Sequence, residues 1–290
     1  MKLSFTTVDV FTKTRYQGNP LALVHVPAYH DPLTQAQKQL IAREFNLSET
    51  VFLHEPTNTS SAADPNPIKI DIFTPDAELP FAGHPTIGSA WYLLSHLSRP
   101  VQSLLTKAGP IPISLSDSSL VRAKLPHNVH IHSHTVPSPL NDLANPIVSI
   151  VRGVSFILVH LPDLEALAKA EYTLHKDSYN ASILDPGWQE GLIGTLYYVS
   201  QGAGTYRTRM HVNFEDPATG SASGALGAYL ALHEPKEKGS GPFKYSLVQG
   251  VEMGKRSEIG VEVVRGEDGG VEEVCLSGTA VKVMEGSLEV

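Results

Sequence analysis

Apolar and polar positions alternate in short stretches through the first half of the chain. The segment IKIDI at 68–72 alternates at every residue, which predicts a half-buried strand. Leu40, Ile41 and Phe45 recur at helical spacing and predict a helix over residues 34–45 with these three on one face. The same patterns predict a second helix at 85–97 and further strands at 3–5, 8–10, 47–53 and 121–125.

The second half repeats this scheme. Strands are expected near 154–161, 196–200 and 205–212, and an apolar helix at about 217–232. Each half therefore holds several strands and one notable apolar helix. This repetition predicts an α+β fold made of two similar domains that arose by internal duplication.

Residues 133–146 carry three prolines and interrupt the pattern, so they are the best candidate for a linker. We expect an N-terminal domain over 1–127 and a C-terminal domain over 128–278. The last strand, at about 279–290, is a candidate for returning to the first domain.

Composition narrows the class of protein. The 290 residues carry a formal net charge of -8, and 18% of them are charged, which argues against a nucleic-acid partner bound through a basic surface. No signal-peptide core and no run of about 20 apolar residues is found, so we expect a cytoplasmic protein with no membrane partner.

Cysteine and histidine content limits the chemistry further. The single Cys275 allows no intrachain disulfide, no Cys-rich zinc site and no mechanism that needs two thiols. Among thirteen histidines, His130, His132 and His134 alternate like metal ligands on a strand, close to His127. No further carboxylate or histidine motif supports them, so no metal site is expected.

Two glycine-bearing segments fall short of phosphate-binding motifs. GVEMGK at 250–255 lacks the Ser or Thr that follows the lysine of a P-loop, and GAGTYR at 202–207 lacks the third glycine of a dinucleotide fingerprint. We therefore expect no cofactor.

The starts of the two apolar helices look alike. His84-Pro85 opens the first and Asp216-Pro217 the second, which predicts His84 and Asp216 as N-cap residues, because proline favours the first helical position. Glycines in both first turns would permit close approach of backbone or ligand. Two such helix N-termini would suit a small carboxylate; ordinary capping and tight packing are the alternative explanation.

Glu49 is the candidate base. On a strand over 47–53 it shares a face with Leu47, Val51 and Leu53, so it would lie among apolar side chains. Burial would raise the pKa of the carboxyl group and make it a proton shuttle near neutral pH. A solvent-facing glutamate on an edge strand, or a partner in an ion pair, is the alternative.

Five segments together resemble the PhzF-like family of phenazine biosynthesis. They are VDVFTKTRYQGNPLALV at 8–24, NLSETVFL at 46–53, FTPDAELPFAGHPTIG at 73–88, EDPATGSASG at 215–224 and SGTAVKVMEGSLEV at 277–290. The resemblance implies a diaminopimelate epimerase-like fold: two similar domains, each a curved β-barrel-like sheet around a central helix, with the active site in the interdomain cleft. It also implies a homodimer.

The resemblance further implies a reaction and its residues. The family's isomerisation of trans-2,3-dihydro-3-hydroxyanthranilate needs no cofactor, and its glutamate matches Glu49. His84 and Asp216 match residues that assist proton movement or hold polar groups of the substrate. The residues implied in binding a small carboxylate substrate are Ser221, Gly220, Gly83, Thr219 and Asn19.

The related epimerases use two cysteines that would fall at Ala82 and Thr219, so this chain cannot perform two-thiol racemisation. The stretch MHVNF before EDPATGS is also shorter than the family usually carries, which can reshape the pocket. The sequence thus predicts an isomerase that shuttles a proton between carbons through Glu49. A non-catalytic binding protein on the same scaffold is the alternative.

Overall fold

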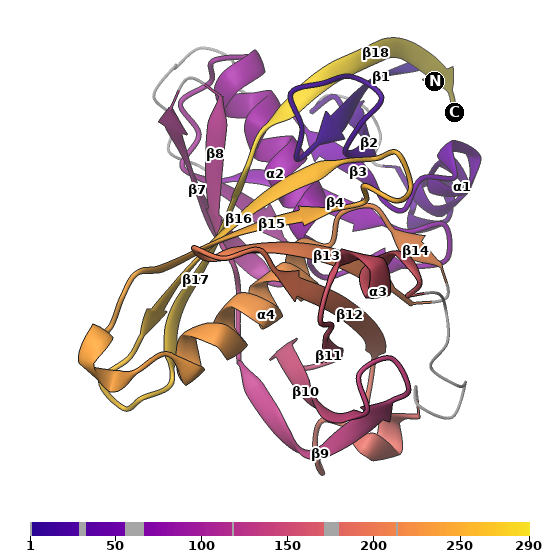
Figure 1. Cartoon of the computed structure of the whole chain (residues 1–290). Coiled ribbons are helices and arrows are strands. Elements are labelled where there is room, and N and C mark those ends of the chain that lie inside the picture. The colour runs from indigo at the N-terminus through magenta and orange to yellow at the C-terminus, as the bar shows by residue number, and fades with distance from the viewer. Residues whose placement is uncertain (1, 29–32, 56–66, 118, 171–179, 213) are drawn as a thin grey trace. The chain divides into compact units, whose positions relative to one another are not determined.

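The computed structural model describes residues 2–28, 33–55, 67–117, 119–170, 180–212 and 214–290 (Figure 1). The chain divides into two compact units, one made of 1–124 with 277–290 and the other of 125–276. Both combine many strands with few helices, so the predicted α+β class is confirmed. Within the described ranges, no helix has the length and apolar character needed to cross a membrane.

The first unit is a sheet that curves around one helix. Its neighbouring strands follow the order β18, β1, β2, β3, β4, β6, β7, β8, with β5 beside β4. Helix α2 contacts strands near both ends of this order, which places it inside the curve (Figure 1). The bounds are β1 Lys2–Val10, β2 Asn19–Val26, α1 Gln35–Phe45, β3 Thr50–His54, β4 Ile68–Phe73, β5 Glu78–Leu79, α2 Gly83–Trp91, the π-helical turn η1 Tyr92–His96, β6 Ser103–Thr106, β7 Gly109–Asp117, β8 Leu120–Lys124 and β18 Ala280–Glu289.

Helix α1 begins and ends on local signals. The Thr34 hydroxyl accepts the Gln37 amide in a capping box, and Asn46 closes the helix in the left-handed region with φ 50°. The predicted helix over 34–45 is therefore confirmed. Its buried face differs from the prediction, because Ala42 is buried whereas Leu40 is 62% exposed.

Helix α2 is buried along its whole length, so small residues decide how it packs. A Cβ on Gly88 would lie 2.5 Å from Leu21 Cδ2 and 2.9 Å from Val10 Cγ2. This glycine, predicted to permit close approach of backbone or ligand, thus lets the helix approach strands β1 and β2.

The second unit is organised in the same way around helix α4. Strands β9, β10, β11, β12, β13, β15 and β16 are successive neighbours, and β14 pairs with β13. Helix α4 contacts β10, β11, β15 and β16, and it is apolar all round because it is enclosed. The bounds are β9 His130–Ser138, β10 Leu143–Val151, β11 Val154–His160, α3 Leu164–Ala168, η3 Ala181–Ile183, β12 Leu192–Ser200, β13 Thr205–His211, β14 Glu215–Asp216, α4 Gly220–His233, η4 Lys236–Lys238, β15 Phe243–Gln249, β16 Ser257–Arg265 and β17 Val271–Gly278.

The prediction of a linker at 133–146 is wrong. These residues form the end of β9, a turn and the start of β10, which pair as an antiparallel hairpin. Two of the three prolines are tolerated because of where they lie: Pro139 is in the turn, and Pro146 borders a register shift in the ladder. The third, Pro137, lies within β9 opposite Ala144.

A buried cluster fastens α1 to the sheet of the first unit. Asp71 Oδ2 accepts hydrogen bonds from Lys38 Nζ at 2.6 Å and His54 Nε2 at 2.7 Å. Burial raises the pKa of Asp71, but the hydrogen bonds and charges of His54 and Lys38 outweigh it and hold this pKa far below its usual value.

We expect Asp71→Asn to lower the free energy of unfolding at pH 7 by roughly 3 kcal/mol, because it leaves the buried Lys38 ammonium without its carboxylate. A depressed folded-state pKa contributes stability above the unfolded pKa, about 3.9, and this contribution is lost as pH falls further. Urea unfolding of wild type and variant at pH 7 and pH 3 tests this. A difference that does not shrink at pH 3 contradicts it. Asp76→Asn, in an exposed turn, is the control.

Candidate active site

The two helix starts are built alike, but not at the predicted residues. The N-cap of α2 is Ala82 and that of α4 is Thr219, so the prediction of His84 and Asp216 as N-caps is wrong. Each N-cap carbonyl accepts a hydroxyl from four residues on: from Thr86 Oγ1 at 2.8 Å and from Ser223 Oγ at 2.9 Å. Proline is tolerated within the first turn, which is why Pro85 did not mark the boundary.

This alignment of N-caps changes which residues correspond. Gly83 matches Gly220, and His84 matches Ser221 rather than Asp216. Upstream, the two-residue strands β5 and β14 also match, each followed by a proline, Pro80 or Pro217. The duplicated segments are therefore ELPFAGHPT at 78–86 and EDPATGSAS at 215–223.

Glu49 lies in the link between α1 and β3, not in a strand. Helix α1 ends at Phe45 and β3 begins only at Thr50. The predicted strand over 47–53 is thus too long, because a bend that follows the left-handed cap at Asn46 occupies its first residues. The strand itself is buried on both faces from Thr50 to Leu53, so its position still holds Glu49 against the core, with its side chain 17% exposed.

His84 is the partner of Glu49. Its Nδ1 lies 3.2 Å from Glu49 Oε2, and the ring is only 3% exposed. The other ring nitrogen, Nε2, is buried with no hydrogen-bond partner among the described residues. An unpaired buried ring nitrogen beside a carboxylate is costly unless a ligand meets it, so this atom is a candidate contact for substrate.

The charge state of Glu49 differs from the expectation. Burial raises its pKa, but the charge of His84 and the hydrogen bonds with His84 and Ser48 outweigh burial and hold the pKa below its usual value. The raised pKa predicted from burial alone is therefore wrong. Glu49 is a carboxylate at neutral pH, which is the form that removes a proton.

Asn19 and Gly83 lie in the same unit as the Glu49–His84 pair. Asn19 opens strand β2 and is 1% exposed, and its Oδ1 accepts the Ser48 hydroxyl at 3.2 Å. Ser48 is the residue before Glu49, so this hydrogen bond ties Asn19 to the segment that carries Glu49. Gly83 is the first residue of α2, and the backbone N–H groups of a first turn have no acceptor within their own helix.

The second unit brings together Asp216, Thr219, Gly220 and Ser221. Thr219 donates its hydroxyl to Asp216 Oδ2 at 2.5 Å, which fixes this carboxylate beside the start of α4. Gly220 is the first helical residue, and Ser221, the second, is half-buried. The four residues therefore form one local group.

Gln249 holds this group in place, although no sequence motif singles it out. Its Nε2 donates to the Asp216 carbonyl at 2.7 Å and to Thr219 Oγ1 at 3.2 Å, while its Oε1 accepts the Thr219 amide at 3.3 Å. Arg209 is a second residue that the sequence analysis did not single out. It donates two hydrogen bonds, of 2.7 and 2.8 Å, to the Glu215 carboxylate. Both contacts come from other strands, so no local motif reveals them.

We expect Gln249→Leu to lower the free energy of unfolding by about 1–3 kcal/mol, since a buried amide and a carbonyl lose their partners. Equilibrium urea unfolding measures the change. Gln201→Leu, at an exposed position, is the matched control and should leave stability nearly unchanged. Equal unfolding curves for wild type and Gln249→Leu would show that this amide does not hold the segment.

Ala82 and Thr219, the positions that the resemblance matches to the thiols of the related epimerases, are the two N-caps. Cys275 is elsewhere, in β17, and its Sγ lies 3.2 Å from Glu273 Oε1.

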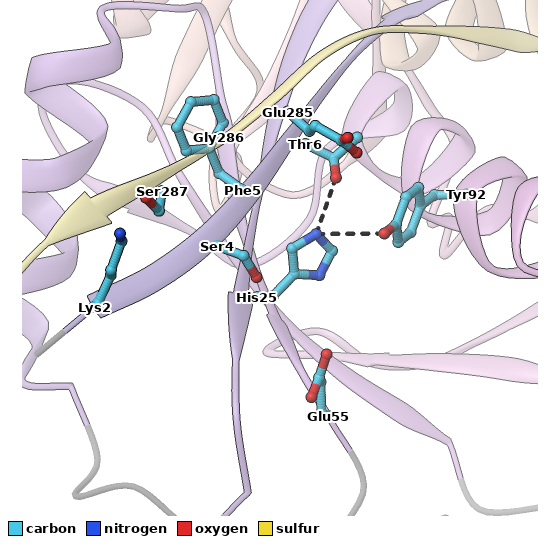
Figure 2. A pocket seen from close by; sticks show the side chains of 10 residues that line it. All are labelled: Lys2, Ser4, Phe5, Thr6, His25, Glu55, Tyr92, Glu285, Gly286 and Ser287. Atoms are coloured by element: carbon cyan, nitrogen blue, oxygen red, sulfur yellow. Dashed lines mark hydrogen bonds between the residues drawn. The ribbon is translucent and has the colours of Figure 1, made fainter.

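A separate polar pocket of about 530 Å³ lies in the first unit (Figure 2). Its centre is the buried His25, whose Nε2 lies 3.1 Å from Thr6 Oγ1 and 3.4 Å from the Tyr92 hydroxyl. Burial lowers the pKa of His25, so its ring is neutral at neutral pH. The site residues named from the sequence are not among those that line this pocket.

Comparison with known proteins places the fold. The structure matches that of a PhzF-family phenazine biosynthesis protein from Bacillus anthracis with a TM-score of 0.77 over 100% of both chains, at 23% identity. The molecule thus has the epimerase-like fold that the sequence predicted.

Sequence comparison goes further. The family model of the phenazine biosynthesis-like proteins matches residues 8–286. An uncharacterized isomerase from Pasteurella multocida is 34% identical over 276 residues, covering 91% of this chain and 88% of the relative. Trans-2,3-dihydro-3-hydroxyanthranilate isomerase from Pseudomonas fluorescens is 32% identical over 268 residues, covering 88% of each chain. The chain belongs to the phenazine biosynthesis-like (PhzF) family, and the predicted enzyme class, isomerase, is confirmed.

Proposed function

We propose that this isomerase moves a proton between two carbons of a small amino- or hydroxy-substituted carboxylic acid, without a cofactor, through Glu49. The observation that carries the proposal is the buried Glu49–His84 pair, in which the carboxylate lies 3.2 Å from the ring nitrogen. A trans-2,3-dihydro-3-hydroxyanthranilate isomerase at 32% identity makes that compound the first substrate to test.

The reaction needs one base that becomes an acid. Glu49, ionised at neutral pH, removes a proton from one carbon, and the electron pair moves into the adjacent unsaturated system. The protonated Glu49 then returns the proton to another carbon. Substrate and product have the same formula, so the step requires no oxidant or reductant.

His84 has two tasks in this proposal. Its Nδ1 side stabilises the Glu49 carboxylate before proton removal, and its buried Nε2 meets a polar group of the substrate. Asp216 is proposed as a further group that assists proton movement. The backbone N–H groups of Gly83 and Gly220, with Ser221, Thr219 and Asn19, are proposed to bind polar groups of the substrate, its carboxylate in particular.

The test is turnover of trans-2,3-dihydro-3-hydroxyanthranilate and related small carboxylic acids by the wild-type protein in deuterated water, followed by NMR. We expect an isomerised product in which the receiving carbon carries either solvent deuterium or the hydrogen removed from the other carbon. Product formed without movement of a carbon-bound hydrogen would overturn the proton-shuttle mechanism. Binding of these acids without turnover of any would favour a non-catalytic binding protein.

A further inference from the structure

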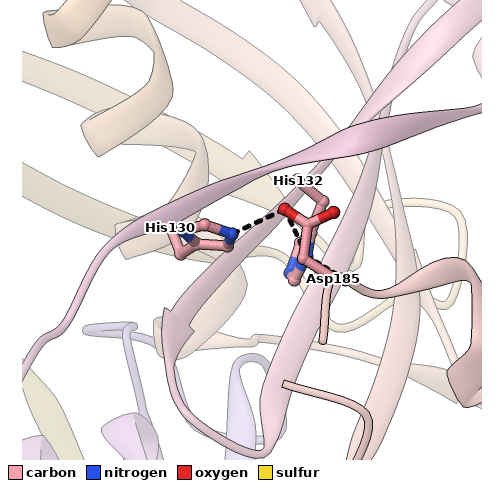
Figure 3. A group of neighbouring side chains, drawn as sticks. All are labelled: His130, His132 and Asp185. Carbon is pink, nitrogen blue, oxygen red and sulfur yellow. Dashed lines mark hydrogen bonds and ion pairs between the residues drawn. The ribbon is translucent and has the colours of Figure 1, made fainter. Parts of the chain in front are cut away.

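Two histidines on strand β9, His130 and His132, face Asp185, which comes from a distant part of the second unit (Figure 3). His130 Nε2 lies 2.8 Å from Asp185 Oδ2, and His132 Nδ1 lies 3.8 Å from the same oxygen. One ligand atom from each of these residues lies within 4.8 Å of the others. A third histidine of the same strand, His134, has its Nδ1 3.8 Å from Asp185 Oδ1. Asp185 supplies the carboxylate whose absence from the local sequence argued against a metal site at these histidines.

The side chains of this cluster are held from outside, as metal ligands are. His132 Nε2 lies 2.8 Å from Ser149 Oγ, while its Nδ1 accepts the Asp185 amide at 3.0 Å. These two contacts fix the tautomer in which Nδ1 carries the lone pair, on the side of the ring that faces Asp185. The His130 ring stacks on Trp188 with 4.6 Å between centroids, which fixes its plane.

The aspartate is also fixed. Ser133 donates its hydroxyl to Asp185 Oδ1 at 2.6 Å, and its backbone amide lies 3.2 Å from both carboxylate oxygens. Oδ2 remains the oxygen turned toward the two imidazoles (Figure 3). Two ring nitrogens and one carboxylate oxygen thus converge from two segments more than 50 residues apart in the chain.

We propose that His130, His132 and Asp185 form a binding site for a divalent transition-metal ion of the zinc class. Imidazole and carboxylate donors favour Zn²⁺, Co²⁺, Ni²⁺ or Cu²⁺ over Mg²⁺ and Ca²⁺, which prefer oxygen ligands. The ion replaces the hydrogen bond between His130 and Asp185 and the one from the Asp185 amide to His132. When the ion takes the place of the first, the Nε2 proton of His130 passes to solvent or to Nδ1 of the same ring, which frees the Nε2 lone pair. The three residues supply three ligands, and His134 or water supplies the next.

The site would act as a clip within the second unit. It joins the segment after η3, which carries Asp185, to strand β9, and none of its ligands is a residue proposed for proton transfer. Metal binding should therefore stabilise the second unit and protect its 180–190 segment from hydrogen exchange, while leaving isomerase chemistry to Glu49.

The test is titration of the purified full-length protein with ZnCl₂ by calorimetry, and with CoCl₂ by its visible absorption. We expect one equivalent to bind, with the Co²⁺ spectrum of a site that contains nitrogen ligands. Asp185→Asn, which keeps the shape of the side chain, and His130→Asn should each weaken Zn²⁺ binding by about 10–100-fold or more. Zinc should raise the melting temperature of the wild type but not of these variants.

His160→Asn is the matched control, because His160 also lies on a strand of the second unit but outside the cluster, stacked on Tyr198. It should bind Zn²⁺ as the wild type does. Circular dichroism without metal establishes that each variant is folded, and the two ligand variants provide independent readings. The absence of saturable Zn²⁺ binding to the wild type, or equal affinity of wild type and both ligand variants, overturns the proposal.

Discussion

Replacing Glu49 by glutamine is expected to reduce kcat by about 10²–10⁴-fold, the usual contribution of general acid–base catalysis. Glutamine has nearly the same shape and still reaches His84, but it cannot accept a proton from carbon. At 25 °C the loss corresponds to roughly 3–5 kcal/mol in the activation barrier. Kinetics with the best substrate from the screen measure it, and KM should change less than kcat because the substituted group acts on the transition state.

The matched control for Glu49 is Glu55→Gln. The two glutamates flank the same strand, β3, but Glu55 lines the other pocket, and its replacement should leave kcat unchanged. Where the wild type exchanges the substrate hydrogen with deuterated water, this exchange gives a second reading, since it should cease in Glu49→Gln. Undiminished kcat in a folded Glu49→Gln protein would show that another group removes the proton.

The fold could be predicted from the sequence where local signals are strong. Thr34 and Asn46 delimit α1, and the alternating isoleucines of β4 are buried as expected. The segment at 133–146 was misread as a linker because two of its three prolines are tolerated at a turn and beside a register shift, which only the pairing of β9 with β10 reveals. Strand pairing is a long-range property that local composition does not encode.

The candidate site shows the same limit. Motif resemblance singled out Glu49 and His84, and the structure brings them together in one unit. The sign of the pKa shift of Glu49 could not be predicted, because it depends on His84 outweighing burial. Gln249 was missed since it reaches Thr219 from β15, thirty residues along the chain. Long-range polar contacts of this kind leave no periodic signal.

The two duplicated helix starts carry different residues. At matching positions of the two helix starts, the first unit has His84 where the second has Ser221, and Leu79 where the second has Asp216. The N-caps hold Ala82 and Thr219 instead of a pair of thiols. Neither N-cap can therefore act as a thiol base, which is consistent with the proposal that Glu49, a carboxylate outside the duplicated segments, takes the proton.

Replacing His84 by glutamine is expected to shift the pH dependence of catalysis as well as its rate. In the wild type, the charge of His84 and its hydrogen bond lower the pKa of Glu49 against the effect of burial. Without that charge, burial prevails and the pKa of Glu49 rises. Because Glu49 must be ionised to remove a proton, activity at the acidic end should be lost at a higher pH than in the wild type.

The profile of kcat/KM against pH measures this shift, since it reports groups of the free enzyme. We expect the acidic limb of His84→Gln to move upward in pH, with kcat/KM at the plateau reduced by roughly 10–100-fold because Nε2 no longer meets the substrate. His96→Gln, at an exposed position in the turn that follows α2, should keep the wild-type profile. An acidic limb that stays in place while the rate falls would mean that His84 contacts the substrate without setting the charge of Glu49.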